Sequence, residues 1–494
     1  MKKKLLAIFA VTSLMALASC GGANANGGED GEGGGNDTVT IKYTNQWGKD
    51  KQGVIDGLIE DFEKDHPNIK VEEIKVGGYD GALSQTKSDL STGNGEHGDL
   101  VICYPDHVMT YIDFGVAVNL QTLIDDPEVG WSEDDKADYI AGFVSEGKQF
   151  PIEGTYCLPY VKSTEALFYN KDVLIGLNLQ SVDPTINNGN AITAEYIDSL
   201  TWEEFFGKLC PALMTYNDGL ATDKKILVDG GETAINGICG YDSTANLFIN
   251  LCEQYGYGYT SSNTATGKGS IDFNNDNMKS VMKVFNKASL AGYIKPSTAQ
   301  SGSGGYCSGY FTKQNLLFNI GSTAGAKHEV SKSFDVNVAP IPGAASGNKH
   351  VISQGPSLCI LRHNEGGKEM ANKRIKAAWE LYKFLTSTVN NANWAISESY
   401  LPVRISSLGV DDYVSHTDLN KPAKSEELLA AKTCKYSTAA SNNVFTSAVF
   451  KGSSEARAQV GGLMSEVLLA DHELSDAELT KLFDQAYENI VKVM

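Results

Sequence analysis

The sequence predicts an α/β fold, because short strand-like and helix-like patterns alternate along the first part of the chain that can fold. Alternating β-branched residues or continuous apolar residues predict strands at 38–43, 69–76 and 99–103. Between these strands, residues 54–65 place apolar side chains at the spacing of one helix face, and residues 79–92 are also expected to be helical. This order of elements is typical of a mainly parallel sheet flanked by helices.

Later segments continue the pattern. Residues 159–169 predict a further extended segment, and Thr201 with Glu204 three residues later has the pattern of a capping box that begins a helix. Three further helices are expected, at 278–288, 373–386 and 475–494. The tryptophans that fall in helical patterns are expected to be core residues, namely Trp202, Trp379 and Trp394.

Length and charge limit the possible functions. At 494 residues the chain is too long for one ordinary hydrophobic core, so two lobes or domains are expected. A hydrophobic fraction of 41% and a charged fraction of 21% are typical of a globular protein. The formal net charge of −20 argues against nucleic acid as a partner and against a basic face that docks on anionic lipid.

The N-terminus has the pattern of a bacterial lipoprotein signal peptide, residues 1–20. Three lysines precede an apolar run that is too short to span a bilayer, and the sequence Leu-Ala-Ser-Cys then ends at Cys20. This resembles a lipobox, so Cys20 is expected to carry the lipid that anchors the protein outside the cytoplasm at the cell membrane. Residues 21–37, rich in glycine, asparagine and acidic residues, are expected to form a flexible tether.

Eight cysteines follow Cys20, and none has a spacing typical of a zinc site. Export permits disulfides, and Cys239 with Cys252 is the first pairing to consider, although sequence cannot fix connectivity. Residues 272–278 superficially resemble a calcium loop, but they lack its glycine at position six and its acid at position twelve. They are interpreted as a turn that caps the next helix, and no metal or cofactor is expected.

Residues 158–172 (LPYVKSTEALFYNKD) resemble a signature of the large extracellular solute-binding proteins, which are the sugar- and glycerol-phosphate-binding receptors of ABC importers. Four further segments resemble the family in its order, at 201–205, 311–322, 376–385 and 400–403. The resemblance implies a type II periplasmic-binding-protein-like fold, in which two α/β lobes, each with a mainly parallel sheet, enclose a ligand cleft. Such a hinged cleft closes on its ligand because the ligand contacts both lobes.

The resemblance also implies where the lobes lie in the sequence. Lobe 1 is expected to comprise residues 38–162 and 331–364, and lobe 2 residues 163–330 and 365–494. The chain is then expected to cross between the lobes near 158–164, 327–334 and 362–367.

Resemblance to the glycerol-3-phosphate-binding branch implies a set of ligand-binding positions. Asp106 lies one residue after the position of that branch's glutamate, which is Pro105 here, and Lys451 stands where the branch has an arginine that pairs with phosphate. Lysine is a point charge and lacks the bidentate geometry of a guanidinium, which places phosphate binding in doubt. The other matching positions are Tyr79, Ser163, Ser322, Gly355 and Tyr400.

Sugar chemistry independently indicates further candidates, since sugars need aromatic platforms beside short polar partners. Loops that follow predicted strands contain Trp47, Tyr241 and Tyr306 with such neighbours. Trp47 is interpreted either as a stacking residue or as a rim residue. Arg404, just after Tyr400-Leu401-Pro402, is interpreted either as a ligand contact or as part of a surface ion pair.

These observations predict the substrate-binding protein of an ABC transporter, expected to be a monomer that captures a carbohydrate and delivers it to the permease subunits. The alternative ligand is glycerol-3-phosphate or a related phosphorylated polyol. The alternative class is an extracellular glycosidase, for which Asp106 and Glu165 would be the two carboxylates. No Gly-x-Ser-x-Gly, P-loop or dinucleotide motif occurs in the sequence, and an enzyme is not expected.

Overall fold

The computed structural model describes residues 38–494 except 264–265, 267, 301–304, 421–424 and 441–442. Cys20 and the expected tether lie outside the described residues. The described chain forms one compact unit, built on two five-stranded sheets.

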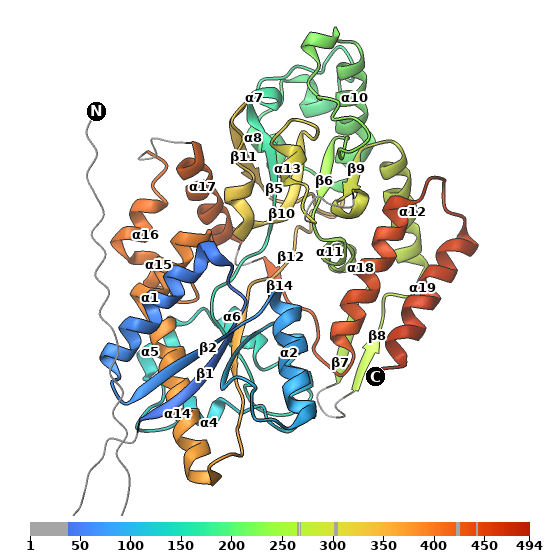
Figure 1. Cartoon of the computed structure of the whole chain (residues 1–494). Coiled ribbons are helices and arrows are strands. Elements are labelled where there is room, and N and C mark those ends of the chain that lie inside the picture. Colours follow the sequence, from blue (N-terminus) through green and yellow to red (C-terminus); the bar gives the residue numbers. More distant parts are fainter. Residues whose placement is uncertain (1–37, 264–265, 267, 301–304, 421–424, 441–442) are drawn as a thin grey trace, which may run out of the picture. The chain divides into compact units, whose positions relative to one another are not determined.

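Sheet 1 has the strand order β2-β1-β3-β13-β4 (Figure 1). Its first strand, β1, pairs in parallel with both β2 and β3, because a helix connects each strand to the next. Strand β13 returns from a distant part of the sequence and pairs antiparallel with β3 and β4. The bounds are β1 (Val39–Asn45), β2 (Ile69–Lys75), β3 (Leu100–Cys103), β4 (Leu158–Pro159) and β13 (Ser357–Ile360).

Helices from both ends of the sequence pack on sheet 1. In Figure 1, α1 and α14 both lie beside β1, and α14 contacts β1 and β13 directly. The helices before the first crossing are α1 (Lys49–Asp65), α2 (Gly78–Thr92), α3 (Pro105–Asp113), α4 (Gln121–Ile124), α5 (Glu133–Asp138) and α6 (Ala141–Glu146). The later ones are α14 (Gly367–Leu385), α15 (Thr388–Glu398), the 3-10 helix η6 (Ser406–Gly409) and α16 (Asp411–His416).

Sheet 2 has the order β11-β5-β10-β6-β9. Strand β10 is antiparallel to β5 and parallel to β6, while β11 pairs antiparallel with β5 and β9 pairs parallel with β6. The bounds are β5 (Glu165–Asn170), β6 (Cys239–Tyr241), β9 (Ile294–Pro296), β10 (Phe318–Ser322) and β11 (Val336–Ala339). Two small pairs complete the strands, β7 (Thr260–Asn263) with β8 (Lys268–Ile271), and β12 (Val351–Ile352) with β14 (Val444–Phe445).

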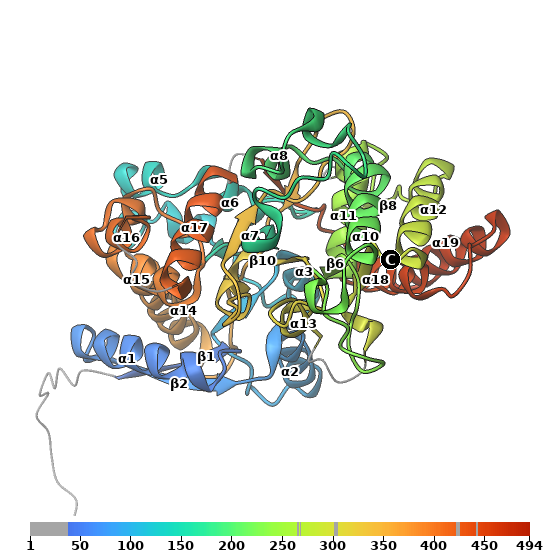
Figure 2. The ribbon, with the colours of Figure 1, turned by 90° about the horizontal axis from the view of Figure 1, so that it is seen from above.

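The helices of sheet 2 include a side-by-side group formed by α11, α12, α18 and α19 (Figures 1 and 2). Helix α17 instead contacts β11 and the 3-10 helix η5. The bounds are α7 (Lys171–Leu174), η1 (Ile186–Gly189), α8 (Ala194–Ser199), α9 (Trp202–Glu204), the π-helix η2 (Phe205–Leu209), α10 (Cys210–Asp218), η3 (Thr222–Lys224), α11 (Thr244–Tyr255), α12 (Asp276–Leu290), η4 (Ser297–Ala299), α13 (Ser308–Phe311), η5 (Thr323–His328), α17 (Ser425–Ala440), α18 (Ser453–Leu469) and α19 (Asp476–Val491).

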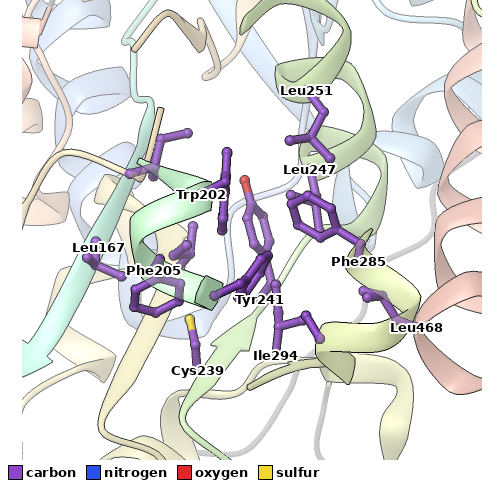
Figure 3. Packing of buried hydrophobic residues seen from close by; sticks show 14 of the residues in the cluster. Leu167, Trp202, Phe205, Cys239, Tyr241, Leu247, Leu251, Phe285, Ile294 and Leu468 are labelled. Carbon is purple, nitrogen blue, oxygen red and sulfur yellow. The ribbon is translucent and has the colours of Figure 1, made fainter. Parts of the chain in front are cut away.

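Each sheet has its own hydrophobic core. In the core of sheet 2, Trp202 packs against Phe285, with ring centroids 5.1 Å apart, and Tyr241 lies among the same side chains (Figure 3). Trp379 and Trp394 belong to the core of sheet 1. All three tryptophans expected in the core are buried there.

The sheets are mixed, whereas the sequence predicted mainly parallel ones. The parallel pairs are those whose strands are joined through helices, and the antiparallel pairs involve strands β4, β5, β11 and β13, which lie on either side of a passage between the sheets. When the chain passes from one sheet to the other, the direction in which it enters the sheet is reversed. Local sequence patterns do not reveal this reversal.

The described chain passes between the sheets at residues 160–164, as expected for the first crossing, and returns between β11 and β13. Strand β11 lies within the range expected for lobe 1 but pairs in sheet 2. Helix α14 lies within the range expected for lobe 2 but packs on sheet 1. The lobe boundaries themselves stay a prediction.

The eight cysteines of the described chain are buried and unpaired, so Cys239 and Cys252 do not form the considered disulfide. One lies on β6 and the other on α11, and burial raises the pKa of both thiols well above the usual value.

Asn275 caps α12 by accepting a hydrogen bond from the Met278 amide, as expected for a capping turn. Within the described ranges, no group of three or more histidine, cysteine or acidic side chains is arranged to hold a metal ion.

A buried ion pair joins α14 to sheet 1. Asp99 accepts hydrogen bonds from Arg374 at 2.7 and 2.6 Å and from the Lys42 amide at 2.7 Å. The Asp99 side chain is 1% exposed. We predict that Arg374→Met lowers the free energy of unfolding by about 3 to 5 kcal/mol, because it leaves a buried carboxylate without its partner.

Urea denaturation at neutral pH measures this loss. Lys64→Met is the matched control, since Lys64 and Asp61 form an exposed pair at 2.8 Å, and its effect on stability is expected to be far smaller. Equal effects of the two substitutions would contradict the prediction.

Candidate functional site

A cavity of about 80 Å³ lies where loops and helix ends from both sheets meet. Sheet 1 contributes the loop after β3 and the end of α6, and sheet 2 contributes α11 and the start of α18. The segment that returns from sheet 2 to β13 forms part of its wall. The lining residues are Tyr104, Pro105, Asp106, Glu146, Gln149, Ile249, Tyr259, Ile352, Ser353, Gln354, Gly355, Thr446, Ser447, Ala448, Val449, Ser453 and Arg457.

Several of the polar groups in this lining have their hydrogen-bonding capacity unused. The hydroxyls of Tyr259, Ser447 and Ser453 are buried and have no hydrogen-bond partner among the described residues. Buried polar groups normally have partners, so these hydroxyls have hydrogen-bonding capacity that the described residues leave unused. Tyrosine rings beside free hydroxyls and amides are the combination that sugar recognition requires.

Tyr104 begins the sheet 1 side of the cavity as the N-cap residue of α3, with Pro105 in the first turn. Its ring contacts that of Tyr79, with centroids 4.5 Å apart. The Tyr79 hydroxyl lies 3.5 Å from the Tyr400 hydroxyl. Burial raises the pKa of both Tyr79 and Tyr104 above the usual value, so both phenols stay neutral at physiological pH.

Trp47 supports this aromatic group from behind. It is 5% exposed, and its ring contacts Trp394 edge to face at a centroid distance of 4.8 Å and Tyr400 at 6.3 Å. Trp47 does not line the cavity, so it holds Tyr400 in place as a core residue.

The two segments that connect the sheets pair with each other beside the cavity. The Ser163 amide donates to the Gln354 carbonyl at 2.9 Å, and the Gln354 amide donates to the Ser163 carbonyl at 2.8 Å. The Ser322 hydroxyl donates to the Ser163 hydroxyl at 3.4 Å. Gly355 follows with a φ of 93°, and a Cβ there would lie 2.5 Å from the Val161 carbonyl oxygen, so only glycine fits this turn.

A buried ion pair fixes the same place from the sheet 1 side. The Lys162 ammonium donates to the Glu146 carboxylate, and these side chains are 1% and 4% exposed. Lys162 also donates to the Gly355 carbonyl at 3.3 Å, while the Ser353 hydroxyl donates to Glu146 at 2.6 Å. The pair therefore joins α6 to both connecting segments.

On the sheet 2 side, a chain of polar groups leads from the cavity to a buried acid. Arg457 donates to the Asn246 side-chain oxygen, and the Asn246 amide nitrogen donates to the Glu165 carboxylate at 3.0 Å. Tyr241 and Asn250 donate to the same carboxylate at 2.6 and 2.8 Å. Burial raises the pKa of the Glu165 carboxyl to about 7, although these donors and the charge of Arg457 lower it.

The structure brings together seven of the eleven residues that the sequence proposed for the site. Asp106 and Gly355 line the cavity. The others connect to its lining through the aromatic contacts or the backbone pairing described above, namely Trp47, Tyr79, Ser163, Ser322 and Tyr400.

The other four lie elsewhere. Tyr241 is fully buried in the core of sheet 2, and Tyr306 is 61% exposed. The Arg404 guanidinium pairs with Asp135 at 3.0 Å and Asp138 at 3.1 Å, which is the ion-pair alternative, although Arg404 itself is buried. None of these three side chains lines the cavity, and neither does the exposed Lys451.

Arg457 is the main residue that the sequence analysis missed. The resemblance pointed to Lys451, six residues earlier, but α18 begins at Ser453 and places Arg457 one helical turn into the cavity wall. One signal was available, since Arg457 is the only arginine after Arg404 in the sequence.

The fold and this cavity define a class of binding protein with two sheet-based lobes. A family model of bacterial extracellular solute-binding proteins matches residues 57–421, which is most of the chain. The chain therefore belongs to the bacterial extracellular solute-binding proteins. No sequence among the curated proteins matches it.

Solved structures share the fold at low sequence identity. UgpB from Mycobacterium tuberculosis, solved with glycerophosphocholine, has a TM-score of 0.67 and 17% identity, over 92% of this chain and 98% of that one. The GacH receptor of Streptomyces glaucescens, solved without ligand and with acarbose, has a TM-score of 0.64 and 16% identity, over 92% and 99%. MalE from Bdellovibrio bacteriovorus, bound to maltotriose, has a TM-score of 0.62 and 15% identity, over 92% and 99%.

Among the helices of the described chain, we find none with the length and apolar character needed to cross a membrane.

We predict that Lys162→Met destabilises the protein by about 3 to 5 kcal/mol, because Glu146 then remains as a buried, unpaired charge in the cavity wall. The double variant Glu146→Gln with Lys162→Met should recover most of this loss, since it removes both charges. Denaturant unfolding of the two variants measures the difference, and a double variant no more stable than the single one would refute the interpretation.

Proposed function

We propose that this protein captures a carbohydrate, a mono- or oligosaccharide, in the cavity between its two sheets and delivers it to the permease of an ABC transporter. The observation that carries this proposal is the cavity itself, in a member of the extracellular solute-binding family. Its lining combines tyrosine rings, amide groups and hydroxyls that have no partner among the described residues, which suit the hydroxyl edges and apolar faces of a sugar. GacH and MalE, which share the fold, were solved with such ligands.

In this proposal, each side of the cavity has a distinct role. Tyr104 and Tyr259 supply ring surfaces from the two sides, while Asp106 and Gln354 bind hydroxyls. Arg457 donates to a ligand oxygen. Because the ligand contacts elements of both sheets, it stabilises the arrangement in which they are close together, and the permease recognises that arrangement.

A phosphorylated polyol is the second candidate ligand, and Arg457 is the observation that favours it. A guanidinium in a cavity wall pairs well with phosphate oxygens. UgpB, which has the same fold, was solved with a phosphate-containing ligand. We do not propose glycosidase activity, because the carboxylate of Glu165 is held by three side-chain donors below the cavity instead of facing Asp106 across it.

A thermal-shift screen of purified protein with sugars, maltodextrins and glycerol-3-phosphate tests the proposal. A ligand at a thousandfold excess over its dissociation constant should raise the unfolding free energy by about 4 kcal/mol. Stabilisation only by peptides or by metal ions would exclude the proposed ligand class.

Once a ligand is found, we predict that Arg457→Met weakens its binding by about 10- to 100-fold, because a charged hydrogen-bond donor in the cavity is lost. Lys451→Met is the matched control, since Lys451 is exposed and does not line the cavity. Calorimetric titration measures both variants, and a larger effect at Lys451 would mean that the ligand binds elsewhere.

We further propose that Cys20 anchors the protein to the outer face of the cell membrane through lipid, on the basis of the N-terminal sequence pattern. Cys20→Ser should move the protein from the membrane fraction to the medium or periplasm in a producing bacterium. Asn24→Ser, which keeps the cysteine, should leave it in the membrane fraction. Quantitative immunoblots of the fractions decide the matter, and equal distributions of the two variants would refute the anchor.

A further inference from the structure

Arg457, Asn246 and Glu165 form a chain of hydrogen bonds, called the relay below. It connects the guanidinium in the cavity wall to a carboxylate that does not itself line the cavity. Asn246 is 1% exposed and uses both ends of its amide, accepting from Arg457 and donating to Glu165. Glu165 is 1% exposed and lies at the start of β5, so its carboxylate does not reach a ligand itself, and Asn246 connects it to the charged group Arg457 in the cavity wall.

The surroundings of Glu165 contain one cation. Tyr241 of β6 and Asn246 and Asn250 of α11 donate to its carboxylate, and the Tyr436 hydroxyl of α17 donates to its backbone carbonyl at 3.0 Å. Among the described residues, Arg457 of α18 is the cation whose charge lowers the pKa of Glu165. The negative charge of Glu165 is therefore balanced by Arg457 and by no other side chain of the described elements around it.

The balance of charge at the cavity follows from this arrangement. Glu146 is paired with Lys162, which leaves Arg457 and Asp106 as the other charged groups of the lining. With Glu165 ionised, the positive charge of Arg457 already has a counter-charge, and an incoming anion would also be repelled by Asp106. With Glu165 neutral, Arg457 has no internal counter-charge and can bind an anion.

We propose that Glu165 is a specificity-determining residue that acts through Asn246 and Arg457, so that the ionised acid selects neutral, hydroxyl-bearing ligands and the neutral acid admits anionic ones. This inference rests on the proposed function, since it concerns the same cavity, and it names the ligand class. Because Glu165 touches no ligand, it is a positioning residue for Arg457.

The pH range of the effect follows from the titration of Glu165. Burial raises the pKa of this carboxyl to about 7, so it changes charge between about pH 6 and 8. An anion bound at Arg457 raises the pKa of Glu165 further, and by linkage binding takes up protons and becomes tighter as the pH falls. A shift of one unit corresponds to about tenfold in affinity.

Inorganic sulfate is the probe, because its own charge is constant over this range. Calorimetric titrations at pH 6, 7 and 8 should show that the unaltered protein binds sulfate about tenfold more tightly at pH 6 than at pH 8. Glu165→Gln should bind sulfate at pH 8 about as tightly as the unaltered protein does at pH 6. The double variant Glu165→Gln with Arg457→Met should lose this increase in sulfate affinity at pH 8.

Two controls separate the relay from general effects. Glu329→Gln neutralises another buried acid of the sheet 2 side, which accepts from Asn319 at 2.8 Å, and should leave sulfate binding unchanged. The ring of His107 lies beside that of Tyr104, with centroids 5.6 Å apart, so the experiment is repeated in a His107→Gln background.

Equal sulfate affinity of the unaltered protein and Glu165→Gln at every pH would overturn the proposal, and so would the absence of sulfate binding from all variants. If Glu165→Gln does not fold, a measurement of proton uptake on sulfate binding replaces the titration of that variant. Calorimetry in buffers of different ionisation enthalpy measures the protons taken up when sulfate binds to the His107→Gln protein at pH 7. The uptake should be a fraction of a proton, and zero uptake would contradict the relay. Sugars that fail to bind while the sulfate linkage holds would refute the proposed function and the selection of neutral ligands, and would leave only the control of anion binding by Glu165 standing.

Discussion

The pairing of the two connecting segments is the interaction on which the cavity depends. Ser163 and Gln354 exchange two backbone hydrogen bonds, and Lys162 ties the same two segments to Glu146 on α6. Residues from sheet 1 and sheet 2 can line one cavity because their connections are fixed relative to each other at this point. Gly355 permits the approach, since a side chain there would meet the Val161 carbonyl.

Rigid connections and an adaptable ligand site are compatible because they use different parts of the chain. The connecting segments are buried and internally hydrogen-bonded, whereas the cavity side chains come mostly from loops and helix ends. The hydroxyls of Tyr259, Ser447 and Ser453 have no partner among the described residues, which lowers the stability of the protein without a ligand. A ligand that forms hydrogen bonds with them gains binding free energy. Binding sites are disproportionately built on loops for the same reason.

Local sequence patterns predicted those features that depend on local forces. The N-cap at Thr201, the burial of Trp202 and the helix after Asn275 agree with the structure, because each depends on neighbouring residues, although only the Thr201 half of the predicted capping box is present. Strand direction and sheet membership depend on distant partners. The sequence therefore did not indicate that β11 pairs with β5 or that α14 packs on sheet 1.

The same distinction applies to the site. The loop after β3 and the segment around Ser163 were predictable, because a motif marks each of them. Arg404 stands next to such a motif, but its partners Asp135 and Asp138 come from more than 260 positions earlier, and only the fold shows that they are close. Arg457 carries no motif at all, and its position follows from where α18 begins.

Charge placement gives the cavity its chemical character, and total charge does not. The chain carries a net charge of −20, yet one arginine lies in the cavity wall. An isolated arginine in a partly buried wall would favour any anion that enters, and anions are abundant outside the cell. An internal carboxylate placed one amide away prevents such capture while leaving the guanidinium free to donate to neutral oxygens. A receptor for a neutral solute needs such a counter-charge, and the Asn246–Glu165 relay provides it.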